Sequence, residues 1–309
     1  MKTARSTLFV IAALIAFPLT AQRQLNLPTD AQIRERLPQG VTFMPDIAYR
    51  EGNEAWKLDL AMPTNRGESP RPAIVFIHGG GWRNGDKRAP SFLNPTLEYA
   101  SKGYVCVTVN YRLLKDESTN IGHCVQDVKN AVRWLRAHAE KYNVDPNRIG
   151  ATGNSAGAHL SVMLGLSPKK KGLEGDGPYQ EFSSDVQAVA ASATPTSFLI
   201  PMSDRARGRF AAEMKNGNPQ REALQKISPI SYVSADTPPL LLFHEASDKT
   251  VGVYQSDTFV QALREAGAAD VNYVLFGDGT GHGTFQRNIA VTEPMREAFF
   301  ARTLLLKEN

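Results

Sequence analysis

Ser155 stands in a pattern that can present a nucleophile. Residues 153–157 read Gly-Asn-Ser-Ala-Gly, which places the serine at the centre of a G-x-S-x-G motif. The apolar run at 148–152 predicts a strand, and the small and apolar residues at 156–166 predict a helix. A serine on the sharp turn between such a strand and helix has its hydroxyl exposed above the sheet edge. We expect glycines beside it because a side chain there would collide with the crowded backbone.

The motif also fits a glycine-rich turn with an ordinary surface serine, so its chemistry depends on partners elsewhere in the chain. Asp248 follows an apolar run at 239–244, and His282 lies between glycines after another run at 271–276. A serine hydroxyl becomes a good nucleophile when a base takes its proton, and histidine does this near neutral pH. A carboxylate fixes the tautomer of that histidine and stabilises its charged form. The chain order Ser155, Asp248, His282 is that of nucleophile-elbow hydrolases, and it predicts these three residues as catalytic.

Each partner has a competing interpretation. Asp248 also fits a turn cap, and His282 also fits a loop histidine without a partner. His123 precedes a predicted helix and His159 lies within one, so we expect both to pack or to cap. His244 closes a strand a few residues before Asp248, and we expect it to support the acid loop.

A run of glycines supplies the remaining part of such a site. Gly79, Gly80 and Gly81 follow His78 at the end of the apolar run 73–77. Backbone N–H groups in a run without side chains can turn inward, and with the N–H of Ala156 they would stabilise an oxyanion.

Strands alternate with helices along the chain and must position these groups. Fully apolar runs at 73–77, 104–109 and 239–244 predict strands covered on both faces. Helices are expected at 91–101, 123–142, 253–266 and 292–306. This alternation predicts an α/β fold with a mostly parallel sheet and helices on both faces. The strands within 47–62 are expected to form an antiparallel edge, after a lead-in at 22–44.

The first residues resemble a secretory signal peptide. Lys2 and Arg5 precede an apolar run at 8–16, and small residues follow up to Ala21. The apolar run is shorter than the about 20 residues that span a bilayer. We therefore expect a signal peptide at 1–21, cleavage after Ala21, a secreted or periplasmic protein and no stable membrane insertion. A retained membrane anchor is the alternative.

Composition restricts the partners. The 309 residues suffice for one large α/β domain. The formal net charge is only +4, and no stripe of Lys and Arg alternates with aromatic residues, so we expect no nucleic-acid partner. No cluster of Cys and His has metal-ligand spacing, and we expect no metal. A disulfide between Cys106 and Cys124 stays open, because export allows it but strand-to-helix geometry is demanding.

Four segments together resemble a known family of enzymes: HGGGW at 78–82, VNYRL at 109–113, VQDVKNAVRWLR at 125–136 and GNSAGAHLS at 153–161. They are similar to α/β-hydrolase-fold serine esterases of the hormone-sensitive-lipase-like group, and most similar to its bacterial feruloyl/acetyl-xylan esterase-like branch. The resemblance implies Ser155 as nucleophile, Asp248 as acid and His282 as base. It also implies Gly80, Gly81 and Ala156 as oxyanion-hole donors. We expect an α/β-hydrolase domain at 45–309. Within it, strand periodicity is lost at 195–237 and the sequence is polar and helix-leaning, which predicts a small cap insertion.

The chain departs from that family at three places near the expected substrate. Ala158 stands where a further glycine is common, the acid loop reads HEASD instead of HGxxD, and ATPTS at 193–197 replaces GPTD. The second departure brings Glu245 near the expected catalytic residues. These changes affect the expectation for the acyl pocket and leave the three catalytic residues in place.

The leading hypothesis is a secreted carboxylic-ester hydrolase that works through an acyl-enzyme and needs no cofactor. The resemblance implies acetyl or feruloyl esters on a polysaccharide as substrates. A serine peptidase of the dipeptidyl or prolyl type, or a non-catalytic binding protein on the same scaffold, are the alternatives. The acyl group, the alcohol and the oligomeric state stay open.

Overall fold

The computed structural model describes residues 26–305 except 117, 168, 170–171 and 205–219. The expected signal peptide therefore lies outside the described residues, and so does the middle of the expected cap insertion. No helix among the described residues is long and apolar enough to cross a membrane.

The described strands form one sheet of eight strands in the order β1-β2-β4-β3-β5-β6-β7-β8. β1 pairs antiparallel with β2, β2 pairs antiparallel with β4, and every other pairing is parallel. The mostly parallel sheet with an antiparallel edge is confirmed. The strands are β1 Val41–Ala48, β2 Lys57–Pro63, β3 Arg71–Ile77, β4 Val105–Val109, β5 Val144–Asn154, β6 Ala188–Ser192, β7 Leu240–Glu245 and β8 Val271–Phe276.

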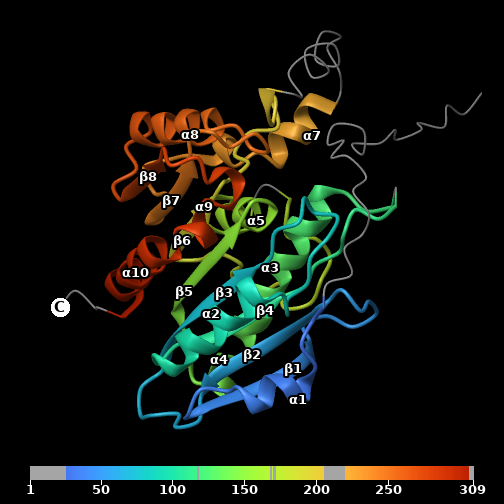
Figure 1. The fold of residues 1–309 in the computed structure, drawn as a ribbon. Helices are drawn as coiled ribbons and strands as arrows, with labels where there is room; N and C mark the ends of the chain where they lie inside the picture. Colours follow the sequence, from blue (N-terminus) through green and yellow to red (C-terminus); the bar gives the residue numbers. More distant parts are fainter. Residues whose placement is uncertain (1–25, 117, 168, 170–171, 205–219, 306–309) are drawn as a thin grey trace, which may run out of the picture.

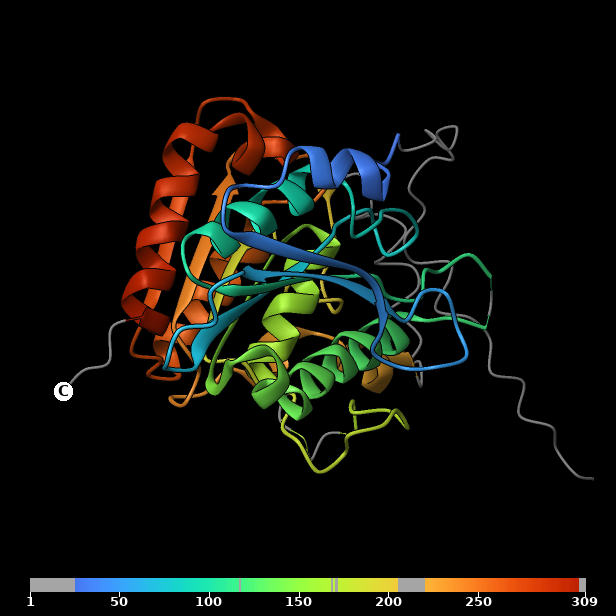
Figure 2. The ribbon, with the colours of Figure 1, turned by 90° about the horizontal axis from the view of Figure 1, so that it is seen from below.

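Helices cover both faces of this sheet, as Figures 1 and 2 show. α3, α5 and α8 pack on one face, and α2, α9 and α10 pack on the other. The helices are α1 Asp30–Glu35, α2 Pro90–Ser101, α3 Ile121–Ala137, α4 Ala139–Tyr142, α5 Ala156–Leu166, α7 Gln220–Lys226, α8 Tyr254–Glu265, α9 Thr284–Arg287 and α10 Ile289–Phe300. Short 3₁₀ turns lie at Pro229–Tyr232 and Gly281–Gly283, and a π-helical turn at Ala301–Leu305 follows α10.

The apolar runs behave as strands covered on both sides. In β3, Val75 and Ile77 belong to the core cluster under α3 and α5, whereas Ile74 and Phe76 belong to the cluster under α10. All four side chains are at most 1% exposed. Because successive strand residues point to opposite faces, a strand buried on both sides needs an unbroken apolar sequence.

Some boundaries differ from the expectation. β1 begins at Val41, so the sheet includes the last residues of the segment expected as a lead-in. The helix expected at 123–142 is interrupted at His138, where α3 ends and α4 begins. The turn expected at 145–147 is a bulge inside β5, since Val144 and Ile149 face Arg71 and Ala73.

The two cysteines are buried and free. Cys106 points into the core cluster beneath α10, and Cys124 lies on α3 in the cluster on the opposite face. The sheet separates them, so no disulfide joins them.

Candidate active site

Ser155 lies on a sharp turn between β5 and α5 with a backbone that few non-glycine residues adopt, at φ 52° and ψ −121°. Its N–H donates to the carbonyl of Ser192 at the end of β6. Neighbouring glycines make the turn possible. A Cβ on Gly157 would lie 2.1 Å from the carbonyl oxygen of Ile77, and one on Gly153 would lie 2.5 Å from the carbonyl carbon of Gly157. The steric need for both glycines is confirmed.

The structure brings the three predicted residues together, although 127 and 34 positions along the chain separate them. The Oγ of Ser155 lies 2.9 Å from Nε2 of His282, and Nδ1 of His282 lies 2.8 Å from Oδ2 of Asp248. With the proton on Nδ1, the ring donates to the carboxylate and leaves Nε2 free to accept the serine proton. The side chain of His282 is 29% exposed and that of Asp248 is fully buried.

Asp248 is held as a carboxylate. Burial alone would raise its pKa, but the hydrogen bonds from His244, His282 and the N–H of Val251 lower the pKa well below the ordinary 3.8. Oδ1 accepts from the N–H groups of Thr250 and Val251 at 2.8 and 3.0 Å. A carboxylate that accepts several hydrogen bonds keeps its negative charge beside the imidazole.

The competing histidines have structural roles. His244 is fully buried between the hydroxyl of Ser256 and the carbonyl of Val251, behind the acid loop. His123 closes a capping box with Asn120 at the start of α3. His159 accepts from Nε1 of Trp82 and contacts the carbonyl of Ile227, and burial lowers its pKa to about 4. These arrangements agree with the expectation that they cap, pack or support.

The glycine run after β3 forms a tight loop. The carbonyl of Gly80 accepts from the N–H groups of Arg83 and Asn84, and Gly80 and Gly81 both have positive φ, at 114° and 62°. In the described part of the chain, the N–H groups of Gly80 and Gly81 donate no hydrogen bond. They follow the carboxyl end of β3, next to the end of β5 that carries Ser155.

Two side chains from the loop after β4, which were not predicted as part of the site, hold the glycine loop in place. The hydroxyl of Tyr111 donates to the carbonyl of His78, and the two rings stack at 4.3 Å between centroids. Asn110 accepts from the N–H of Lys87 and donates to Asp86. The Asn-Tyr-Arg sequence at 110–112, directly after a buried strand, could have indicated these residues. Polar groups at the carboxyl ends of strands face the site in an open α/β sheet.

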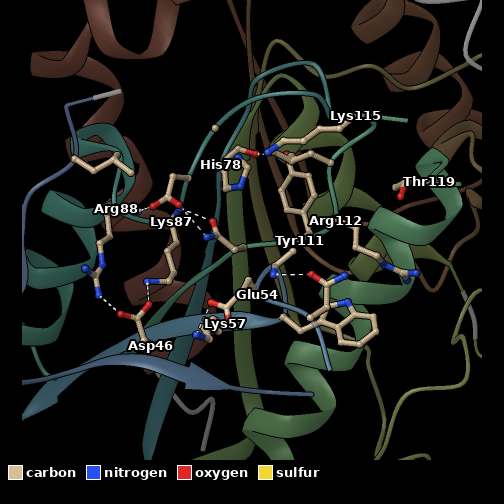
Figure 3. Close-up of a pocket in the computed structure, with 18 of the residues that line it drawn as sticks. Asp46, Glu54, Lys57, His78, Lys87, Arg88, Tyr111, Arg112, Lys115 and Thr119 are labelled. Atoms are coloured by element: carbon tan, nitrogen blue, oxygen red, sulfur yellow. Dashed lines mark hydrogen bonds and ion pairs between the residues drawn. The ribbon is translucent and has the colours of Figure 1, made fainter. Parts of the chain in front are cut away.

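A cavity of about 930 Å³ lies beside this loop (Figure 3). His78, Gly85 and Tyr111 form its wall on the side of the glycine loop. On another side Lys87 and Arg88 turn toward Asp46, to which both make ion pairs. The remaining lining includes Trp56, Arg112, Lys115 and Thr119. The cavity is polar, and most of its charged groups are already paired with one another.

The departure at the acid loop has a clear structural result. Glu245 ends β7 and is 1% exposed. Its carboxylate accepts hydrogen bonds from Ser247 and from the N–H groups of Gly279 and Gly281, which lie on the loop of His282. Burial alone would raise the pKa of Glu245, but these hydrogen bonds lower it.

The lowered pKa of Asp248 predicts how stability depends on pH. A carboxyl group with a folded-state pKa below its unfolded value contributes stability above about pH 4 and loses it as the pH falls through the folded-state value. Asp248→Asn removes this contribution. We expect the difference in unfolding free energy between wild type and Asp248→Asn to be largest at neutral pH and to shrink below about pH 4. Urea denaturation from pH 3 to pH 8 measures it.

Asp236→Asn is the matched control, because Asp236 is exposed. A stability difference for Asp248→Asn that stays constant over this pH range would contradict the stabilising role of the carboxylate.

Comparison with known proteins agrees with the fold and with the motifs. The BD-FAE family model matches residues 58–263. LipM, a probable carboxylic ester hydrolase of Mycobacterium tuberculosis, is 31% identical over 74% of this chain and 53% of LipM. The isoprenylcysteine alpha-carbonyl methylesterase ICME of Arabidopsis thaliana is 26% identical over 78% of this chain and 56% of ICME. The chain thus spans little more than half the length of these curated relatives.

This chain covers nearly the whole length of similar solved structures. A truncated carbohydrate esterase from gut microbiota has a TM-score of 0.72 at 26% identity, covering 86% of this chain and 97% of that one. Esterase 2 of Thermogutta terrifontis, phosphonylated by sarin, has a TM-score of 0.70 at 28% identity, covering 87% and 98%. The expected α/β-hydrolase fold is confirmed, and the chain belongs to the BD-FAE family.

Proposed function

We propose that this protein is a serine carboxylic-ester hydrolase that works through an acyl-enzyme. The observation that carries the proposal is the hydrogen-bonded series Ser155, His282 and Asp248, with distances of 2.9 and 2.8 Å. The esterase relatives and structural neighbours support the same activity.

In the first half of the reaction, Oγ of Ser155 attacks the ester carbonyl carbon while Nε2 of His282 takes the serine proton. The carbonyl oxygen becomes an oxyanion, and the N–H groups of Gly80, Gly81 and Ala156 donate to it. Each such donor is worth about 3 kcal/mol in the barrier. Asp248 stabilises the imidazolium. His282 then gives its proton to the alcohol oxygen, the carbon–oxygen bond breaks, and the alcohol leaves.

In the second half, His282 takes a proton from water as the water oxygen attacks the acyl carbon. A second tetrahedral intermediate collapses, Ser155 recovers its proton, and the acid is released. Every step uses side-chain or backbone groups of this chain, so the proposed reaction needs no cofactor.

We propose short or aromatic acyl groups, such as acetyl or feruloyl, on a polysaccharide. Relatives support this choice in part. The Thermogutta terrifontis esterase 2 has been solved with propionate bound, and another neighbour is a carbohydrate esterase.

Ser155→Ala tests the activity. We expect it to reduce turnover of 4-nitrophenyl acetate by at least about 10³-fold, because the nucleophile is lost while the fold is kept. Steady-state kinetics with acetyl, butyryl, feruloyl and aminoacyl-amide substrates measures activity and acyl preference together. His123→Gln, at a histidine that caps α3, is the control and should retain activity.

Retained activity in Ser155→Ala would refute the assignment. Turnover of the amide alone would indicate a peptidase, and binding without any turnover would indicate a non-catalytic protein.

We propose that the polar cavity beside the glycine loop receives the alcohol part of a polymeric substrate. It shares His78 and Gly85 with the loop that carries two of the proposed oxyanion donors. Its walls offer polar and charged groups suited to the hydroxyl groups of sugars. Ser155 and His282 are not among its lining residues, so we expect the small nitrophenyl acetate to stay outside it.

Thr119→Trp tests this placement by filling the cavity. We expect KM for an acetylated xylo-oligosaccharide to rise about 10-fold, equivalent to about 1.4 kcal/mol of binding. Neither kcat nor KM for 4-nitrophenyl acetate should change. Thr258→Trp, at an exposed position on α8, is the control. Equal effects of Thr119→Trp on the small and the polymeric substrate would contradict the placement.

We also propose export, supported by the charged and apolar pattern of residues 2–21. Expression of the full chain in a bacterium should give a periplasmic or secreted protein whose N-terminal residue is Gln22, as N-terminal sequencing measures. Uncleaved protein in the membrane fraction would favour the anchor instead.

A further inference from the structure

Glu245 connects the two loops that carry Asp248 and His282. It is the last residue of β7, three positions before Asp248. Oε1 accepts from the N–H of Gly279 at 3.1 Å, and Oε2 accepts from the N–H of Gly281 at 3.0 Å. Oε2 also accepts from the N–H and the hydroxyl of Ser247. Both oxygens of one buried carboxylate are therefore used, and two of the four donors precede His282.

The loop of His282 has little packing of its own. A Cβ placed on Gly277, Gly279 or Gly281 would meet no atom within 4 Å. Gly279 and Gly281 have positive φ, at 77° and 60°, which only glycine adopts readily. Such a segment is fixed by hydrogen bonds and not by side-chain contacts.

Apart from the bonds of the His282 ring to Ser155 and Asp248, the other side-chain hydrogen bonds described for this loop come from its own segment of the chain. Asp278 accepts from the N–H and hydroxyl of Thr280. Arg287 and Asn288, at the end of α9, donate to Thr280. The bonds to Glu245 differ, because they attach the loop to the strand that leads to Asp248.

We propose that Glu245 is a positioning residue that sets the place of the His282 ring between Ser155 and Asp248. The inference rests on the proposed function. Glu245 makes no described hydrogen bond to the ring itself, so it acts through the backbone on the N-terminal side of His282. A displacement of about 1 Å at a catalytic group costs on the order of 10² in rate, so an anchor at this place matters for turnover. Glutamate here replaces the glycine common in related acid loops, and the chain thus has an anchor of its own.

Glu245→Gln tests the proposal with a side chain of the same shape. The amide NH₂ of glutamine must take the place of one of the two accepting oxygens. It would then face a backbone N–H group, and two donors cannot form a hydrogen bond. We expect kcat for 4-nitrophenyl acetate to fall about 10- to 100-fold with KM changed less than twofold. Asp278→Asn is the matched control: it weakens another carboxylate contact in the same loop but leaves both bonds to Glu245, and its kcat should stay within about twofold of wild type.

Two further measurements separate positioning from general destabilisation. In a His282→Ala background, Glu245→Gln should have no additional effect on the residual rate, because the residue acts through the missing ring. The downfield proton resonance of the Nδ1–H of His282, hydrogen-bonded to Asp248, should broaden or shift in Glu245→Gln and stay in place in Asp278→Asn.

An unchanged kcat in Glu245→Gln, an equal loss in Asp278→Asn, or a full additional loss in the His282→Ala background would each overturn the proposal. The resonance does not depend on turnover. If the protein hydrolyses no ester, the proposed function is rejected. The positioning role of Glu245 is rejected separately, by a His282 resonance that does not change in Glu245→Gln.

Discussion

The site depends on one close backbone crossing. α5 begins so near to β3 that Gly157 lies against the carbonyls of Ile77 and His78, where a Cβ would be 2.1 and 2.7 Å from their oxygens. This approach forces the chain to turn sharply at Ser155, which takes a positive φ of 52°. A non-glycine residue in such a conformation costs about 1–3 kcal/mol. The surrounding sheet and helix supply that energy, because β5 is paired on both sides and α5 is almost entirely buried.

The same crossing orders the rest of the site. Since β3 and β5 are parallel neighbours, the loop after β3 and the turn after β5 emerge at the same edge of the sheet. Strand pairing thus brings the N–H groups of Gly80 and Gly81, which have no acceptor among the described residues, to the same edge as the hydroxyl of Ser155. β7 and β8 are also parallel neighbours, and their ends deliver Asp248 and His282 to the same edge.

Each of the three loops at this edge is fixed in a different way. The acid loop is anchored by buried groups, since His244 supports Asp248 from behind and Thr250 and Val251 donate to it. The glycine loop is held by Trp82, whose ring centroid lies 5.6 Å from that of Phe198 in the first part of the expected cap. The Nε1–H of Trp82 also donates to His159 on α5. The loop of His282 is connected to the acid loop by the His282–Asp248 hydrogen bond and by the backbone bonds to Glu245.

The order of the elements and the identity of the reactive groups could be predicted from the amino-acid sequence. Unbroken apolar runs such as 73–77 specify strands covered on both faces, and glycines at 153 and 157 specify a crossing that admits no side chain. Ser155, Asp248 and His282 were predicted because their chain order and their places after strands are local features.

Contacts between distant segments were not predictable, since no periodicity encodes them. The folded chain was needed to show that Glu245 accepts from Gly279 and Gly281, that Tyr111 donates to the carbonyl of His78, and that the sheet separates Cys106 from Cys124. The prediction of one helix over 123–142 was wrong at its end for the same reason. The apolar period of the sequence continues past His138, but the helix breaks there. Tertiary packing sets the break, since the His138 ring stacks on Trp134 and contacts Tyr179.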